Sequence, residues 1–157
     1  MDENMETPLR PIGVLHTSFH TASECPRQGS IAGHEGVAEI FSEYTAGLKD
    51  VEKFSHLWLI YKFHDTGPVE LIVTPLLEGS TKRGLFATRH FRRPNPIGMT
   101  LVKILEITGN RVRFVGADMM NDTELLDIKP YVSEIDCPKE SARSGWLEGV
   151  FRDKNRT

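Results

Sequence analysis

The sequence predicts a mostly β protein: a small closed β-barrel of short strands with little helix. Three observations support this fold class. About six to eight short runs are rich in apolar and β-branched residues, turn residues separate these runs, and no strand alternates with a long amphipathic helix. The last observation argues against a parallel, doubly wound sheet.

Length and composition indicate one ordinary domain. The chain has 157 residues, a net charge of −3 and two cysteines, Cys25 and Cys137, too few for a disulfide scaffold or a zinc site. No apolar run approaches the roughly 20 residues of a membrane helix, and no signal-peptide pattern opens the chain. We therefore expect a cytoplasmic protein with no metal and no membrane association.

The first half of the chain predicts three strands. The runs 12–19 and 36–41 are short and β-branched, and the almost entirely apolar run 55–63 predicts a strand buried on both faces. Between the first two strands, residues 21–34 show no periodicity and predict a long loop, either functional or disordered. Apolar residues at intervals of three predict helical turns at Leu48, Val51 and Phe54.

The second half predicts a hairpin and several shorter segments. Residues 99–108 and 111–115 alternate in polarity on either side of the turn dipeptide Gly109–Asn110, which is typical of a β-hairpin. Short strands are expected at 71–74 and 85–88, and residues 118–131 predict an acidic turn followed by a short apolar run. We expect residues 1–10 to be a disordered tail, 11–136 to form the barrel, and 137–157 to be an extension with a short docked helix.

A basic loop is the clearest candidate for function. Five cations and no acid lie between Ser80 and Thr100, and Pro94 and Pro96 stiffen the chain beside them. Guanidinium groups suit phosphate or carboxylate ligands, although a solvated basic loop explains the pattern about equally well. The cations are Lys82, Arg83, Arg89, Arg92 and Arg93.

Sequence motifs exclude several enzyme classes without naming a reaction. The chain has no GxGxxG after a strand, no P-loop, no HExxH and no GxSxG. Three polar loops, at 26–29, 89–98 and 118–129, remain as candidate sites. The pair His64–Asp65 after the apolar strand is either a charged switch or, more commonly, a polar strand end.

Four stretches together resemble one family. PRQG at 26–29, FSHLWLIYKFH at 54–64, GLFATR with RPNPIG at 84–98, and LDIKPY at 126–131 occur in the order and spacing of TsaA-like proteins, the TrmO family. The resemblance implies a β-barrel methyltransferase that uses S-adenosylmethionine. It further implies a homodimer that methylates N6 of threonylcarbamoyl-adenosine next to the anticodon of tRNA.

The resemblance also implies roles for individual residues. The residues expected to bind tRNA phosphates or the threonyl carboxylate are Arg27, Arg92, Arg93 and Lys129. Those expected to take part in the chemistry are Asp127, Tyr131 and Asn95. The cofactor is expected against Gln28, Gly29, His64, Asp65, Arg89, Ile97, Gly98, Met99, Asp118, Met119 and Asn121.

Alternatives to these roles remain open. Arg89 is the candidate for the methionine carboxylate, while Met99 and Met119 either line the adenine or simply fill the core. Asp127 is either a proton acceptor or the partner of Lys129 in a structural ion pair. The alternative function is a non-catalytic module that binds S-adenosylmethionine or a nucleotide.

Two stretches differ from the family pattern. His90–Phe91 stands where Ser-Pro is frequent, and Asn121–Glu124 (NDTE) stands where Asp-Gly-Thr-Pro is usual.

Overall fold

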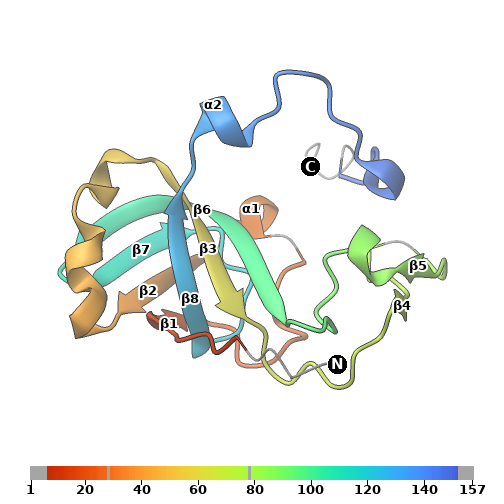
Figure 1. The fold of residues 1–157 in the computed structure, drawn as a ribbon, viewed down its shortest axis with the longest axis horizontal. Coiled ribbons are helices and arrows are strands. Elements are labelled where there is room, and N and C mark those ends of the chain that lie inside the picture. Colours follow the sequence, from red (N-terminus) through yellow and green to blue (C-terminus); the bar gives the residue numbers. More distant parts are fainter. Residues whose placement is uncertain (1–6, 28, 78, 152–157) are drawn as a thin grey trace.

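Six antiparallel strands close into a barrel in the order β1-β2-β7-β6-β3-β8, with β8 pairing back onto β1 (Figure 1). This computed structural model describes residues 7–27, 29–77 and 79–151. The predicted closed barrel is confirmed. The strands are β1 (Gly13–His16), β2 (Glu35–Ile40), β3 (His56–Lys62), β6 (Ile97–Thr108), β7 (Arg111–Val115) and β8 (Thr123–Pro130).

Alternate residues of every strand fill the barrel interior, because successive side chains of a strand point to opposite faces. Phe114 of β7 is the largest fully buried side chain, and it packs in one cluster with aliphatic residues of the neighbouring strands. Apolar contact across the barrel axis therefore holds the sheet closed. The other fully buried residues of the barrel include Leu15, Ile40, Leu57, Leu59, Val102, Val112 and Leu125.

The hairpin of β6 and β7 is confirmed, with Gly109 at φ 60° in its turn. At the start of β6, however, the apolar side chains of Ile97 and Met99 point outward. Met99 is 49% exposed, whereas Thr100 and Val102 are buried against the interior. A bulge between Ile104 and Glu106 then shifts the register.

The expectation for β3 was wrong in one respect. Leu57, Leu59 and Tyr61 are buried inside the barrel, but Trp58 and Ile60 on the other face are only partly buried. An apolar strand in an antiparallel barrel has one interior face, and nothing in the described structure covers the outer one completely. The composition of the run did not reveal this difference.

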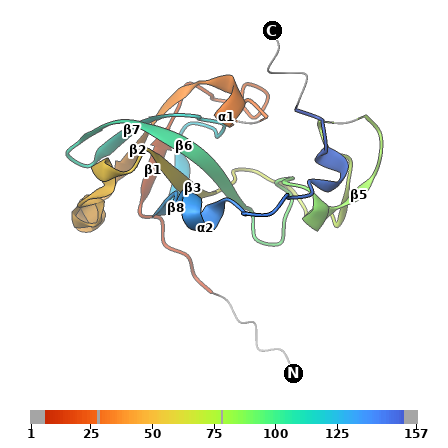
Figure 2. The same cartoon turned by 90° about the horizontal axis from the view of Figure 1, so that it is seen from above.

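A side lobe, defined as residues 66–77 and 79–96, projects from one end of the barrel between β3 and β6 (Figures 1 and 2). It contains the two-stranded pair β4 (Ile72–Val73) and β5 (Arg83–Gly84). The strand expected at 85–88 is instead a single 3-10 turn, η3 (Leu85–Ala87). Leu85 is buried in this lobe and anchors the turn.

The helical elements are all short. Helix α1 (Gly29–Ala32) interrupts the segment predicted to be a loop, and the turns η1 (Ser42–Leu48) and η2 (Val51–Lys53) fall where helical turns were expected. Two further short helices, α2 (Ser133–Asp136) and η4 (Gly145–Leu147), follow β8. No helix among the described residues is long and apolar enough to span a membrane.

The C-terminal segment returns to the side lobe (Figure 1). Trp146 donates its indole N–H to the carbonyl of Ala87 at 2.7 Å, and the Arg83 guanidinium lies 4.7 Å from the indole ring centre. The docked helix expected here is reduced to one 3-10 turn. Residues 1–6, part of the predicted disordered tail, lie outside the described residues.

Candidate functional site

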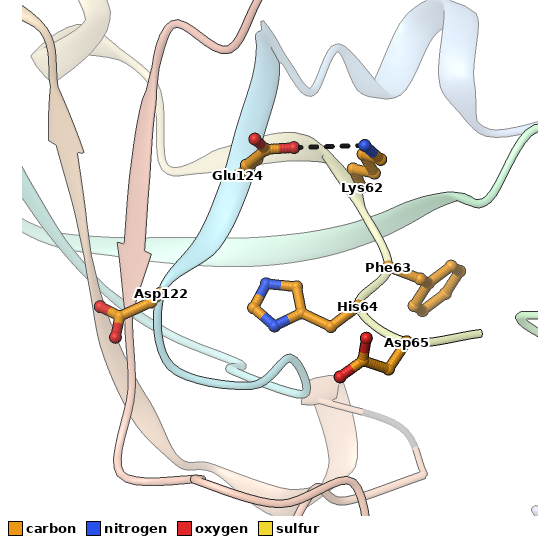
Figure 3. A pocket seen from close by; sticks show the side chains of 6 residues that line it. All are labelled: Lys62, Phe63, His64, Asp65, Asp122 and Glu124. Atoms are coloured by element: carbon orange, nitrogen blue, oxygen red, sulfur yellow. Dashed lines mark ion pairs between the residues drawn. The ribbon is translucent and has the colours of Figure 1, made fainter. Parts of the chain in front are cut away.

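A hollow of about 340 Å³ opens where β3 ends and β8 begins. Figure 3 shows His64 and Asp65 at the end of β3 facing the turn that carries Asp122. Lys62 and Glu124, paired across β3 and β8 at 3.7 Å, form one side. The hollow thus contains two of the predicted cofactor residues, His64 and Asp65. Its lining consists of Lys62, Phe63, His64, Asp65, Asp122 and Glu124.

The lining carries more negative than positive charge. Three carboxylates, on Asp65, Asp122 and Glu124, face one lysine and one histidine. Asp65 and Asp122 also have positive φ angles, 37° and 62°, in a backbone region that residues other than glycine rarely adopt. Such conformations persist where the surrounding structure enforces them, and they are enriched at binding sites. The hollow therefore suits a ligand that carries positive charge.

A second polar centre lies at Asp118, a partly buried residue in the segment between β7 and β8. One of its carboxylate oxygens accepts hydrogen bonds from the Thr100 hydroxyl at 2.7 Å and the Tyr61 hydroxyl at 3.3 Å. The other oxygen accepts a hydrogen bond from the Gly29 amide at 3.1 Å. Asp118 thereby connects the first loop of the chain to β3 and β6.

Burial dominates the electrostatics of this centre. It raises the pKa of Asp118 above the usual 3.8, although the bonds from Thr100, Gly29 and Tyr61 act in the opposite direction. Burial, and then the Asp118 charge, raise the pKa of Tyr61 well above its ordinary value. The same two causes, with a smaller one from Glu24, raise the pKa of the Cys25 thiol to about 11. Tyr61 therefore acts as a hydrogen-bond donor that stays neutral.

Two glycines allow the backbone to approach this centre. A Cβ on Gly29 would lie 1.8 Å from the carbonyl oxygen of Gly116. A Cβ on Gly98 would lie 2.4 Å from the Tyr61 ring and 2.9 Å from the Phe63 ring. Gly29 and Gly98 are both predicted cofactor residues, and in the structure both are needed for close packing.

Aromatic rings connect the centre to the hollow and to the basic loop. Phe63, which lines the hollow, lies edge-on to Tyr61 at 5.5 Å and 6.3 Å from Phe91. Phe91 in turn stacks on His90 at 4.4 Å. Burial, followed by the charge of Arg92, lowers the pKa of His90, which favours the neutral imidazole within this stack.

The predicted residues of the acidic turn have structural partners. Asn121 accepts a hydrogen bond from the Thr17 amide at 3.0 Å, and its own amide donates to Phe19 at 2.7 Å. Met119 is buried in the barrel core, as its core-filling alternative required. These bonds attach the acidic turn to the segment after β1. Asp118 precedes Asn121 in this turn, and Asp122 follows it.

Other predicted residues lie on the outer wall of the barrel. Asp127 pairs with Lys129 at 3.2 Å, so the expected shared strand face and the ion pair are both observed. Tyr131 contacts the rings of His56 and Trp58 at about 6 Å between centroids. Ile97 and Met99 are exposed on β6, on the face opposite Gly98 and Thr100. The structure therefore does not group Ile97 and Met99 with Asp118, because neighbouring residues of a strand face opposite ways.

The basic residues divide into paired and exposed ones. Arg92 pairs with Glu70, and Arg27 donates to the carbonyl of Leu76. Arg93 donates to the carbonyls of Thr88 and His90 at 2.9 and 3.2 Å, which holds its guanidinium in place.

Three further predictions concern the loops. Arg89 and Asn95 are exposed, and the Asn95 carbonyl accepts a hydrogen bond from the Ile97 amide at 2.7 Å. Gln28 lies outside the described residues. Within the described ranges, no group of three or more His, Cys, Asp or Glu residues could hold a metal ion.

Sequence reasoning missed several residues that shape these sites. Tyr61 and Thr100 were placed only as members of apolar strands, and their single hydroxyl groups were the one signal of a polar partner. Asp122 and Glu124 fall in the candidate polar loop 118–129 without a role of their own, and Lys62 falls in the apolar run 55–63. Their convergence depends on the pairing of β3 with β8, which places the end of one strand beside the start of the other.

Comparison with known proteins gives concordant matches. Residues 14–137 match the model of the tRNA-methyltransferase O N-terminal domain. A probable S-adenosyl-L-methionine-binding protein of Pyrococcus abyssi is 47% identical over 140 residues, which cover 88% of this chain and 75% of that protein. A mouse tRNA (adenine(37)-N6)-methyltransferase is 38% identical over 137 residues, which cover 82% of this chain and 32% of the mouse protein.

Solved structures agree with these matches. The crystal structure of TrmO from Pseudomonas aeruginosa superposes with a TM-score of 0.75 at 32% identity. The match covers 91% of this chain and 63% of that one. The present chain thus spans less than two thirds of the solved relative.

Proposed function

The chain belongs to the TrmO family, through its N-terminal domain, and from this premise we propose that it is an S-adenosylmethionine-dependent tRNA methyltransferase. The proposed reaction methylates N6 of threonylcarbamoyl-adenosine next to the anticodon. The supporting observation is the hollow of Lys62–Asp65, Asp122 and Glu124, with its excess of carboxylates. S-adenosylmethionine carries a sulfonium and an ammonium group, both cationic, so the lining suits it.

The bound cofactor would supply an electrophilic methyl group on its sulfonium. We propose that Asp65 and Asp122 hold its positive charge and that Phe63 forms an apolar wall. Arg89, which is exposed and has no ion pair with any described residue, is the proposed partner of the methionine carboxylate. Gly29 and Asp118 act indirectly in this proposal, by holding the first loop against the barrel.

The chemistry of the acceptor nitrogen determines what the protein must contribute to methyl transfer. N6 of threonylcarbamoyl-adenosine belongs to a urea-like group, so its lone pair is delocalised and its proton must leave as the new bond forms. The sulfonium departs as a neutral thioether, so the leaving group needs no acid. Orientation and a proton acceptor are then the main contributions of the residues.

We propose Asp127 as that proton acceptor, with Lys129 binding the threonyl carboxylate. Both side chains face outward from β8 and are partly or fully exposed, so an RNA substrate can reach them. Tyr131 and Asn95 are proposed to orient the base. Arg27, Arg92 and Arg93 are proposed to lie near tRNA phosphates, although each already has a protein partner that fixes it.

Two measurements separate this function from a non-catalytic module. Calorimetry with S-adenosylmethionine, on the wild type and on Arg89→Ala, tests cofactor binding, and the variant should bind about 10- to 150-fold more weakly if a charged hydrogen bond is lost. Mass spectrometry of nucleosides from tRNA incubated with the protein tests methyl transfer. Cofactor binding without any methylated product would establish the binding module instead.

Substitution of Asp127 tests the proposed chemistry. Asp127→Asn should keep cofactor affinity and lower the methylation rate by about a hundredfold or more, the usual scale for loss of a general base. Lys129→Met breaks the same ion pair and leaves the carboxylate in place. Because Lys129 is also the proposed partner of the threonyl carboxylate, this variant should raise KM for tRNA and keep kcat, whereas Asp127→Asn should lower kcat. A wild-type rate for Asp127→Asn between about pH 6 and pH 9 would make Asp127 purely structural.

We also propose a homodimer. Strand edges do not support a dimer through the barrel, because its six-stranded sheet closes on itself. The support that remains is the family resemblance and the exposed apolar side chains of Ile97 and Met99 on the outer wall. Sedimentation at micromolar concentration should give a dimer, and a monomer throughout would refute the proposal.

A further inference from the structure

Phe86 is a large aromatic side chain that the fold leaves in solvent. It is 76% exposed at the middle of the 3-10 turn η3 in the side lobe. Its neighbour Leu85 is almost completely buried in the same turn. At this exposure the ring gains little of the stabilisation that burial provides, so the packing of the lobe does not account for an aromatic side chain here.

The turn that carries Phe86 is held at several points. The Leu85 amide donates to the Leu71 carbonyl at 2.9 Å, and both the amide and the hydroxyl of Thr88 donate back to Leu85, at 3.0 and 2.7 Å. Trp146 from the C-terminal segment is bonded to Ala87. The backbone therefore presents Phe86 outward in a fixed position.

One cation lies against the ring, and two more stand close to it in the sequence. The Arg93 guanidinium lies 5.7 Å from the ring centre, and its bonds to the carbonyls of Thr88 and His90 keep it there. Lys82, four residues before Phe86, and Arg89, three residues after it, are exposed. Within the part of the chain that the structure describes, neither Lys82 nor Arg89 forms an ion pair.

We propose that Phe86 is a stacking platform for one unpaired base of an RNA, with Lys82 beside the RNA backbone. An aromatic face suits a planar, apolar ring, and Arg93 with the exposed cations of the same segment suits a polyanion, so the two features together fit single-stranded nucleic acid. This inference rests on the proposed function, because it assigns part of the surface that receives the tRNA. It adds a contact remote from the methyl-transfer chemistry.

The test measures RNA binding without cofactor. Fluorescence anisotropy with a labelled anticodon stem-loop RNA compares the wild type with Phe86→Ala, which should bind about 5- to 150-fold more weakly, the range for loss of one stacked base. Phe86→Trp should bind as the wild type does. Phe86→Leu keeps much of the apolar surface without an aromatic face, and it should lose affinity as the alanine variant does.

Two further variants serve as controls. Leu76→Ala removes a similarly exposed apolar side chain, 64% exposed, from the same lobe and should leave RNA affinity unchanged. Lys82→Ala should reduce the dependence of log K on log salt by about 0.7, the contribution of one phosphate contact on a single strand. A fully paired RNA of equal length should bind the wild type and Phe86→Ala alike. Thermal melting of each variant verifies its fold.

Several outcomes would overturn the inference. Wild-type affinity of Phe86→Ala or of Phe86→Leu would remove the stacking role. Unchanged RNA binding by Phe86→Ala together with altered sedimentation would identify the face as a contact between copies of the chain. Failure of the proposed function is distinguishable, because it appears as wild-type protein that neither binds S-adenosylmethionine nor methylates tRNA.

Discussion

Replacing Asp118 with asparagine tests the buried centre most directly. Asparagine keeps one oxygen for Thr100 and Tyr61, but it places an amide NH2 against the Gly29 amide, so that two donors face each other without an acceptor. Losing that hydrogen bond leaves the Gly29 amide without an acceptor, which costs about 1–3 kcal/mol of unfolding free energy. For a chain of this size the melting temperature should fall by roughly 2–12 °C.

The effect of Asp118→Asn should depend on pH with a definite sign. Burial raises the folded-state pKa of Asp118 above its usual 3.8, so the protonated carboxyl is favoured by folding. Its contribution to stability is complete below about that value and is lost as pH rises through the folded-state pKa. Asparagine does not titrate, so the destabilisation relative to wild type should be larger at low pH and shrink toward neutral pH.

Urea unfolding of both proteins at several pH values between about 4 and 8 measures this difference. Asp127→Asn is the control, because that carboxylate is partly exposed and paired with Lys129, and its loss should cost less than about 1 kcal/mol. A destabilisation by Asp118→Asn that grows with pH, or none at all, would refute the account of the buried centre.

Two further predictions concern backbone positions near the candidate site. Gly98→Ala should lower the free energy of unfolding by about 1–3 kcal/mol, because its Cβ would lie 2.4 Å from the Tyr61 ring, and urea unfolding with wild-type stability would contradict this. Asp122 has φ 62°, so Asp122→Gly should change stability by no more than about 0.5 kcal/mol, whereas Asp122→Val should destabilise by about 1–2 kcal/mol. Equal melting temperatures for these two variants would show that the backbone there is not strained.

The sequence by itself determined most of the strands and the family. Period-two alternation and the Gly109–Asn110 turn predicted the β6–β7 hairpin, because both signals are local. The four motifs predicted the family for the same reason, since each is a contiguous run of residues. The run of cations between Ser80 and Thr100 was also visible without a structure.

Only the tertiary structure decided which side chains meet. Asp118 bonds to residues 18, 57 and 89 positions away, and no local pattern links such distant residues. The outward direction of Met99 could not be predicted either, because both faces of β6 carry apolar side chains. Residue 86 was expected in a strand, but the burial of one neighbour, Leu85, produced a turn that exposes Phe86. In each case long-range packing selected among local conformations of similar energy.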